Sequence, residues 1–209
     1  MEINEIFYSI QGEGKWMGLP NIFIRTTGCN LRCSFCDTTY AYETGEEMSI
    51  EEIINRIRKH PCNYVCITGG EPLLQEAIVQ LIDVLLEKKY VICLETNGSI
   101  DIENLVGKKS LLISLDIKCP SSAMHKKMNF NNVSLLTCND QLKFIIQNRE
   151  DYEYAKKIIK KYKPQSAIFF QPVWGINLKE LSSWVLNDGL DVRIGLQLHK
   201  IIWGDKKGV

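Results

Sequence analysis

Short apolar runs alternate along the chain with longer segments in which apolar residues recur every three or four positions. The runs are rich in Ile, Val and Leu and end at glycine, proline or polar residues, which predicts buried strands. The longer segments carry one apolar face and predict helices. The expected strands are residues 3–10, 21–26, 64–68, 90–95, 111–117, 141–147, 167–171 and 192–196, and the expected helices are 49–60, 74–88, 151–162 and 178–186.

This alternation of strands and helices indicates βαβ units and a mainly parallel sheet, an α/β fold. Six or so parallel strands are too few for a closed eight-stranded barrel. We therefore expect a partial, laterally open barrel of the (β/α)6 type, formed by residues 1–209 as a single domain. Polar residues and glycines follow the carboxyl ends of these strands, the edge where such folds bind ligands.

Composition narrows the class of protein. Apolar residues make up 45% of the chain, enough for a full core, and the 25 basic residues balance the 25 acidic ones. The balance gives no electrostatic signature of nucleic acid or a membrane surface as a partner. No run reaches the length of a membrane span, and residues 1–14 lack the apolar segment of a signal peptide. We expect a cytoplasmic protein with reduced cysteines.

Three of the eight cysteines lie close together in a loop at residues 28–38. Cys29, Cys33 and Cys36 have the spacing Cys-x-x-x-Cys-x-x-Cys, and the residues between them are mostly polar. Thiolates bind iron or zinc, and this spacing lets one loop hold one metal centre. Structural zinc sites and electron-transfer clusters normally use four protein ligands. Three ligands leave one coordination position open to a substrate or cofactor.

The other cysteines leave alternatives open. Cys62, Cys66, Cys93 and Cys138 lie in or beside apolar runs and are expected in the core, whereas Cys119 fits either role. From the residues alone, a zinc site that borrows one remote cysteine remains an alternative. A disulfide framework is not favoured, because the chain is long enough to form a core without one.

Two glycine-containing segments add candidate ligand contacts. Gly69-Gly70-Glu71-Pro72 directly follows an expected strand, and its glycines expose backbone groups to a ligand without a clashing Cβ. Gln11-Gly12-Glu13-Gly14 has the same property. Each would be an ordinary turn if it stood alone. Arg25 ends the strand before the cysteine loop, where its guanidinium either holds a carboxylate or forms a surface salt bridge.

The cysteine loop followed by Gly-Gly-Glu-Pro resembles the signature of the radical S-adenosylmethionine superfamily. The resemblance implies that Cys29, Cys33 and Cys36 hold a 4Fe–4S cluster whose fourth iron binds S-adenosylmethionine. Reductive cleavage of that cofactor would give a 5′-deoxyadenosyl radical. The partial barrel is also the fold that this superfamily implies.

Further segments, in the same order, resemble the 7-carboxy-7-deazaguanine synthase family over nearly the whole chain. They include residues 11–14, 21–25, 28–30, 36–38, 67–72, 95–98, 116–118, 171–173 and 197–200. The resemblance implies a carbon–nitrogen lyase that converts 6-carboxy-5,6,7,8-tetrahydropterin to 7-carboxy-7-deazaguanine with loss of ammonia. That product leads to the tRNA deazapurines queuosine and archaeosine. The family also implies Mg²⁺, a homodimer, and an electron donor such as flavodoxin or ferredoxin.

The same resemblance implies roles for individual residues. Cofactor contacts would come from Phe35, Cys36, Asp37, Gly70, Asp116, Ile117, Lys118, Gln171, Pro172 and Val173. Pterin contacts would come from Ile10, Gln11, Gly12, Glu13, Arg25, Thr68, Glu95 and His199. Arg25 would pair with the substrate carboxylate, and Thr38 would bind Mg²⁺ through its hydroxyl. With the three cysteines, Arg25 and Glu95 form the predicted catalytic set.

Two departures from the family and two rival functions bear on this interpretation. Several synthases have a longer cysteine spacing, and Asp116-Ile117-Lys118 stands where other members have Ser-Pro-Lys. A glycyl-radical-enzyme activase would share the cysteine loop but would not need Gln11, Glu13 and Arg25 around a small carboxylate. A non-catalytic zinc-binding module would need four protein ligands and would have no use for residues 69–72.

Overall fold

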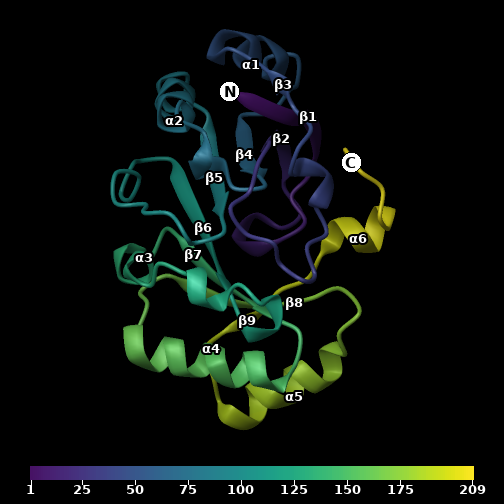
Figure 1. Cartoon of the computed structure of the whole chain (residues 1–209), viewed down its shortest axis with the longest axis vertical. Helices are drawn as coiled ribbons and strands as arrows, with labels where there is room; N and C mark the ends of the chain where they lie inside the picture. The colour runs from purple at the N-terminus through teal and green to yellow at the C-terminus, as the bar shows by residue number, and fades with distance from the viewer.

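The computed structural model describes residues 1–209 and contains one curved sheet of nine strands in the order β3-β1-β2-β4-β5-β6-β7-β8-β9 (Figure 1). Neighbouring strands from β2 to β9 are parallel, whereas β1 runs antiparallel to both β2 and β3 at one edge. The strands are β1 (Glu2–Ile10), β2 (Pro20–Thr26), β3 (Glu46–Glu47), β4 (Tyr64–Gly69), β5 (Val91–Thr96), β6 (Leu111–Lys118), β7 (Gln141–Ile146), β8 (Ala167–Pro172) and β9 (Arg193–Ile194).

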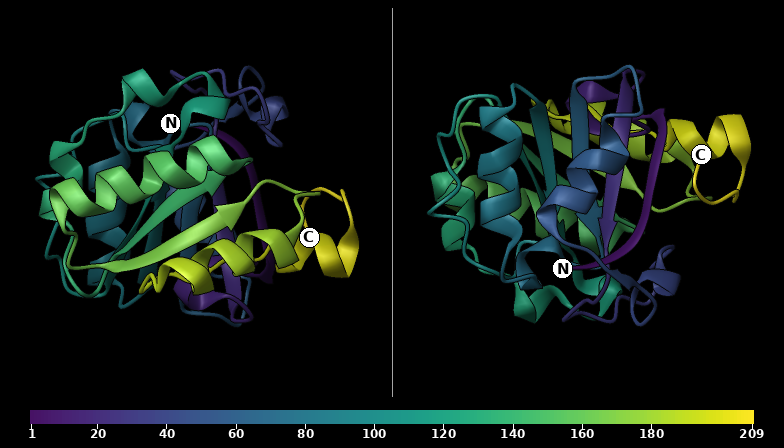
Figure 2. Two further views of the ribbon diagram at one scale, coloured as in Figure 1. Left: turned by 90° about the horizontal axis from the view of Figure 1, so that it is seen from below. Right: turned by 90° about the horizontal axis from the view of Figure 1, so that it is seen from above.

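The main helices pack against the outer face of this sheet, and the inner face stays open (Figures 1 and 2). They are α1 (Ile50–Ile57), α2 (Ile78–Glu87), α3 (Asn131–Leu135), α4 (Arg149–Tyr162) and α5 (Leu178–Asp188), with α6 (Leu198–Trp203) beside the open side of the barrel. The predicted α/β fold with a mainly parallel, laterally open sheet is confirmed. None of these helices combines the length and the apolar character that crossing a membrane requires.

One face of the strands carries apolar residues because it packs against the core. The other face carries several polar residues because it lines the open barrel. Ile22 and Ile24 of β2, and Val65 and Ile67 of β4, are fully buried and belong to the main apolar core. Side chains alternate between the two faces of a strand. The intervening positions therefore point into the open barrel, and several of them are polar near the carboxyl ends of the strands. This alternation supplies the inner wall of the site.

Local signals in the sequence explain where some elements begin and end. Ser49 caps α1 in a reciprocal capping box, in which its hydroxyl accepts from the Glu52 N–H and the Glu52 carboxylate accepts from the Ser49 N–H. The helix predicted for residues 74–88 begins only at Ile78, because Pro72–Leu74 forms a separate 3₁₀ turn. The helix predicted for residues 49–60 ends at Ile57.

Some elements were not predicted. Helices α3 and α6 have only five and six residues, too few to establish an apolar period. The prediction that Cys138 lies in the core is wrong, because it is exposed in the polar turn that precedes β7. Cys66, Cys93 and Cys119 are buried as core residues, and Cys62 is half-buried.

Candidate functional site

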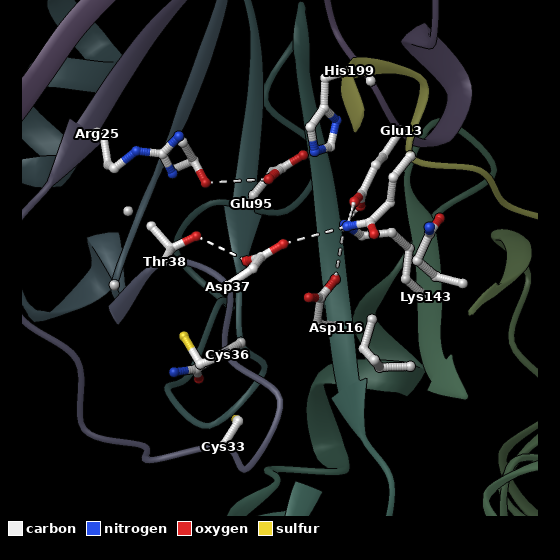
Figure 3. A pocket seen from close by; sticks show the side chains of 18 of the residues that line it. Glu13, Arg25, Cys33, Cys36, Asp37, Thr38, Glu95, Asp116, Lys143 and His199 are labelled. Carbon is white, nitrogen blue, oxygen red and sulfur yellow. Dashed lines mark hydrogen bonds and ion pairs between the residues drawn. The ribbon is translucent and has the colours of Figure 1, made fainter. Parts of the chain in front are cut away.

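A large cavity opens inside the barrel at the carboxyl ends of the parallel strands (Figure 3). Every site residue predicted from the sequence lines this cavity except Ile117. The Ile117 side chain is fully buried in the core, between Asp116 and Lys118, which do line the cavity. The structure therefore brings together residues that lie up to about 190 positions apart in the chain, from Ile10 to His199.

The cysteine loop forms one end of the cavity. Cys29, Cys33 and Cys36 are free, half-buried thiols that line it, and the Cys36 N–H donates to the Cys33 carbonyl at 3.2 Å. Burial raises the pKa of Cys33, and the nearby Lys118 ammonium opposes that shift. The three sulfur atoms do not form a set within 4.8 Å of one another, as the ligands of a single ion would. A four-iron cluster is larger and holds its ligands further apart, so this arrangement is compatible with a cluster.

Cys66 and Cys93 form a second sulfur pair with Glu95, and the ligand atoms of these three residues lie within 4.8 Å of one another. The two cysteines are direct partners on β4 and β5. A hydrogen bond to Cys93 and burial raise the pKa of the Cys66 thiol well above its ordinary value. Cys66 is therefore kept neutral, and both cysteines pack as core residues beneath the cavity wall.

The Gly69-Gly70-Glu71-Pro72 segment connects β4 to the cysteine loop through backbone hydrogen bonds. Gly70 N–H donates to Thr26 O at 3.2 Å, and Glu71 N–H donates to Gly28 O at 2.8 Å. The fully buried Glu71 carboxylate accepts from Thr96 Oγ1 at 2.8 Å and from the Asn97 N–H at 2.6 Å. Burial raises the pKa of Glu71 to about 7 against the effect of these donors. Glu71 thus ties the ends of β4 and β5 together.

We expect Gly70→Ala to separate the cysteine loop from β4. A Cβ at this position would lie 2.0 Å from the Gly28 carbonyl oxygen, and backbone cannot yield as a flexible side chain does. The variant should lose both iron after anaerobic reconstitution and affinity for S-adenosylmethionine.

Gly107→Ala is the control for this prediction. Gly107 has a φ of 79° but no atom within 4 Å of the added Cβ, and it does not line the cavity. This variant should keep its cluster despite backbone strain. Normal iron content and cofactor affinity in Gly70→Ala would contradict the prediction.

Buried polar atoms without a protein partner mark the wall at β8 as a surface that can bind a ligand. Gln171 on β8 is only 2% exposed, and neither its amide nitrogen nor its amide oxygen has a hydrogen-bond partner in the protein. Leaving such a group unsatisfied costs about 1–3 kcal/mol. Because Gln171 lines the cavity at a position predicted to contact the cofactor, this wall fits the binding of S-adenosylmethionine.

Glu95 on β5 is the centre of a second polar group. Its carboxylate accepts from Gln11 Nε2 at 3.4 Å and from Thr68 Oγ1 at 3.2 Å. Burial raises the pKa of Glu95, while the Lys143 ammonium opposes the shift. A carboxylate held in this way can accept hydrogen bonds from the N–H groups of a ligand.

Arg25 lies beside Thr68, its direct partner across β2 and β4. Its Nε donates to Glu5 Oε1 at 2.7 Å, so part of the guanidinium is used within the protein. The terminal nitrogens have no protein partner, and Arg25 lines the cavity. The Arg25–Glu5 pair is therefore not an ordinary surface salt bridge, because it orients a half-buried guanidinium whose remaining donors are available to a carboxylate.

Lys143 is the main cavity residue that the sequence did not identify. It is almost fully buried on β7, and its ammonium lies 3.1 Å from Glu13 Oε2 and 3.1 Å from Asp116 Oδ1 (Figure 3). Lys118 contacts the other Asp116 oxygen at 2.8 Å. Burial opposes the charged form of Lys143, but the surrounding carboxylates raise its pKa above the ordinary value. The sequence does contain a signal for Lys143, which lies in the otherwise apolar segment 142–146. Because buried lysines are rare unless paired, a lysine at this position indicates a buried ion pair.

The segment around α6 closes one side of the cavity. Leu198 N–H donates to Gly12 O at 3.0 Å, and Gln197 Nε2 donates to Glu13 Oε1 at 3.1 Å. The His199 ring packs so closely over Gly12 that a Cβ there would lie 2.0 Å from Nδ1. These contacts hold residues 11–13 against the inner face of the sheet.

Thr38 and Asp37 place oxygen atoms next to the cysteine loop. Thr38 Oγ1 donates to Asp37 Oδ1 at 2.9 Å, and Lys200 Nζ lies 3.1 Å from Asp37 Oδ2. Burial opposes ionisation of Asp37, but Lys200 holds its pKa below the ordinary value. The hydroxyl and the ionised carboxylate are hard oxygen ligands of the kind that Mg²⁺ prefers.

Comparison with known proteins agrees with this geometry. The sequence model described as the Radical SAM superfamily matches residues 23–166. A 7-carboxy-7-deazaguanine synthase of Thermoplasma acidophilum is 37% identical over 209 residues, covering 100% of both chains. One from Methanospirillum hungatei is 39% identical over 203 residues, covering 97% of this chain and 85% of the relative.

Solved structures support the fold. The crystal structure of QueE from Escherichia coli has a TM-score of 0.78 and 22% identity and covers 95% of this chain and 94% of its own. Streptococcus suis SuiB bound to S-adenosylmethionine has a TM-score of 0.59 and 13% identity, covering 80% of this chain and 48% of its own. The matched family model and the curated relatives together show that this chain belongs to the radical S-adenosylmethionine superfamily and, within it, to the 7-carboxy-7-deazaguanine synthase family.

Proposed function

We propose that this chain converts 6-carboxy-5,6,7,8-tetrahydropterin to 7-carboxy-7-deazaguanine with loss of ammonia, as a radical S-adenosylmethionine carbon–nitrogen lyase. The proposal is supported mainly by one observation. The three-cysteine loop and a polar wall that includes Arg25 and Glu95 line the same cavity. The first fits a cluster with an open coordination position, and the second fits a small ligand with a carboxylate and several N–H groups. Relatives that match the whole chain are named for this synthase activity.

Cys29, Cys33 and Cys36 would hold the cluster, with one iron left for the cofactor. Gly70 and the unpartnered amide of Gln171 would bind S-adenosylmethionine on the walls next to it, with Phe35 and Asp37 along the adenine. When bound, the cluster and S-adenosylmethionine together supply the radical chemistry that removes a hydrogen atom from the substrate. Lys118 would help to neutralise negative charge near Cys33.

The substrate would lie between Arg25 and Glu95. The free Arg25 donors would bind the substrate carboxylate, and the Glu95 carboxylate would accept N–H groups of the pterin, assisted by Gln11 and Thr68. His199 and Gly12 would cover one face of the ring. These contacts orient the substrate and exclude water from the reacting carbon.

Three finer features of the proposal rest mainly on the family resemblance. Mg²⁺ would bind Thr38, next to the ionised Asp37, and the substrate carboxylate. An electron donor such as flavodoxin or ferredoxin would reduce the cluster. A cytoplasmic homodimer is the expected state, with no nucleic acid or membrane partner.

The proposed function can be tested with the anaerobically reconstituted protein, a reductant, S-adenosylmethionine, Mg²⁺ and the carboxytetrahydropterin. Mass spectrometry should detect 7-carboxy-7-deazaguanine. Cofactor cleavage with the pterin unchanged would favour a glycyl-radical-enzyme activase, and a protein that binds one zinc ion and no cluster would contradict both enzyme functions.

Glu95→Gln tests the substrate wall separately. A lost hydrogen bond to a charged group costs about 1.5–3 kcal/mol, so kcat/KM for the pterin should fall by roughly 10- to 150-fold. Cofactor cleavage without pterin should persist, because Glu95 is not assigned to the cluster or cofactor. Glu76→Gln, at an exposed position outside the cavity, is the control and should leave kcat/KM unchanged. Equal kcat/KM values for Glu95→Gln and the wild type would contradict the assignment.

A further inference from the structure

Asn97 has no role in the substrate and cofactor contacts above, yet its side chain reaches the cysteine loop. It follows the carboxyl end of β5 in the Glu95-Thr96-Asn97-Gly98 segment, is 7% exposed and lines the cavity. Its Nδ2 lies 3.8 Å from Cys29 Sγ with the geometry of an N–H···S hydrogen bond. Asn97 is therefore a polar group that contacts a predicted cluster ligand without being a ligand itself.

The orientation of the Asn97 amide is determined by its other partners. Its Oδ1 accepts from the Ser99 N–H at 3.0 Å and from Ser99 Oγ at 2.6 Å. A backbone N–H can only donate, so the atom facing it must be the amide oxygen. The amide nitrogen must then face the cysteine loop, where it also donates to Asn30 Oδ1 at 3.0 Å.

The Asn97 backbone is held as firmly as its side chain. Its N–H donates to Glu71 Oε2 at 2.6 Å, which links Asn97 to the segment that binds the Gly28 carbonyl. Cys29 Sγ also accepts from the Leu31 N–H at 3.4 Å. The Cys29 sulfur thus faces two N–H donors, one from its own loop and one from the end of β5.

N–H donors to a ligating sulfur change the energy of an iron–sulfur cluster. A reduced cluster carries one more negative charge than an oxidised one, so a donor stabilises the reduced form more and raises the reduction potential. A short and fixed amide acts in this way without adding a charge or occupying a coordination position.

We propose that Asn97 is a positioning residue that holds the Cys29 sulfur and raises the reduction potential of the cluster through its N–H···S hydrogen bond. The inference rests on the proposed function, because it requires the cluster bound by Cys29, Cys33 and Cys36. It assigns to the Thr96-Asn97-Gly98 segment a role in electron acceptance rather than in substrate recognition. Removing the donor makes the cluster harder to reduce at an unchanged iron content.

The test is a redox titration of the reconstituted holoenzyme, followed by electron paramagnetic resonance of the reduced cluster. Asn97→Asp keeps the shape and the oxygen that accepts from Ser99 but replaces the donor with an oxygen. At a fixed potential, its ratio of reduced to oxidised cluster should fall at least tenfold, equal to a potential lower by about 59 mV. Asn97→Ala removes the donor without adding a charge and should shift the ratio in the same direction by a smaller factor.

Asn30→Asp is the matched control. It adds the same charge to the neighbouring loop and keeps the oxygen that accepts from Asn97, losing only the bond from Asn30 Nδ2 to Ser99 Oγ. Because Asn30 is exposed, solvent screens the added charge, and the ratio of reduced to oxidised cluster should fall by a smaller factor than in Asn97→Asp. A shift as large as that of Asn97→Asp would show that charge alone is responsible and would overturn the proposal.

Other outcomes distinguish a failure of the Asn97 role from a failure of the proposed function. Wild-type potentials in both Asn97 variants, at full iron content, would overturn the role of Asn97 and leave the proposed function intact. Loss of iron from both variants at an unchanged melting temperature would also overturn the redox role, because Asn97 would then be needed only to retain the cluster. Absence of a four-iron signal in the wild type would overturn the proposed function itself.

Discussion

Cys33→Ala is expected to abolish cleavage of S-adenosylmethionine and all product formation. Cys33 is one of only three protein ligands on the loop, and alanine offers iron no replacement. Iron and sulfide content after anaerobic reconstitution should fall together with the yield of 5′-deoxyadenosine. Cys29→Ala and Cys36→Ala should have the same effect, because each removes one of the three ligands.

The other cysteines supply matched controls for this prediction. Cys138→Ala changes an exposed residue and Cys62→Ala a half-buried one, and neither lines the cavity. Both variants should bind the cluster and cleave the cofactor at the wild-type rate. If Cys138→Ala or Cys62→Ala lost iron while Cys33→Ala retained it, the assignment of the cluster to residues 28–38 would be wrong.

Lys143→Met should destabilise the fold by about 3–5 kcal/mol, the usual cost of removing one partner from a buried ion pair. Lys143 is 3% exposed and contacts both Glu13 and Asp116, so the change leaves Glu13 without a cation and Asp116 with Lys118 alone. The free energy of unfolding, measured by urea denaturation, gives the effect. Burial opposes ionisation of Asp116, but Lys118 and Lys143 hold its pKa below the ordinary value. The stabilisation from Lys143 is lost as Asp116 is protonated, so the difference from the wild type should shrink as the pH falls.

A second substitution tests the reason for that loss. Glu13→Gln added to Lys143→Met removes the carboxylate charge that has no other cation and should recover part of the lost stability. Lys156→Met is the surface control, since Lys156 pairs with Glu153 and Asp188 in a solvent-accessible network that contributes little. Equal unfolding free energies for Lys143→Met and the wild type would show that Lys143 does not compensate these carboxylates.

The sheet and the longer helices were predictable because their signals are local. The apolar runs that become β4, β5 and β6 are bounded by turn residues, and α1 carries its own capping box at Ser49. The start of the cysteine loop after β2 could be located for the same reason. So could the turn at residues 69–72 after β4. The extent of β9 was overestimated, because the apolar pattern at residues 192–196 does not show that only Arg193 and Ile194 pair with β8.

The partners of the site residues were less predictable. Arg25 has a recognisable position at a strand end, but its pairing with Glu5 follows from the register of β1 on β2. Asp116 was expected to contact the cofactor, whereas its position between Lys118 and Lys143 follows from β6 lying beside β7. Ile117 was included with its neighbours, but alternation along the strand turns its side chain into the core.

The class of fold and the candidate metal-binding loop could be predicted from the sequence, because both depend on patterns that are local in the chain. Three thiols within eight residues, a glycine pair after a strand and a regular alternation of elements need no long-range contact to be recognised. Which charges compensate one another, and which donors face the cysteine loop, could be seen only once the chain was folded. Glu13 meets Lys143 across 130 positions, and Asn97 meets Cys29 across 68, because strand register and closure of the curved sheet bring them together. No pattern in the sequence near either residue predicts contacts of this kind.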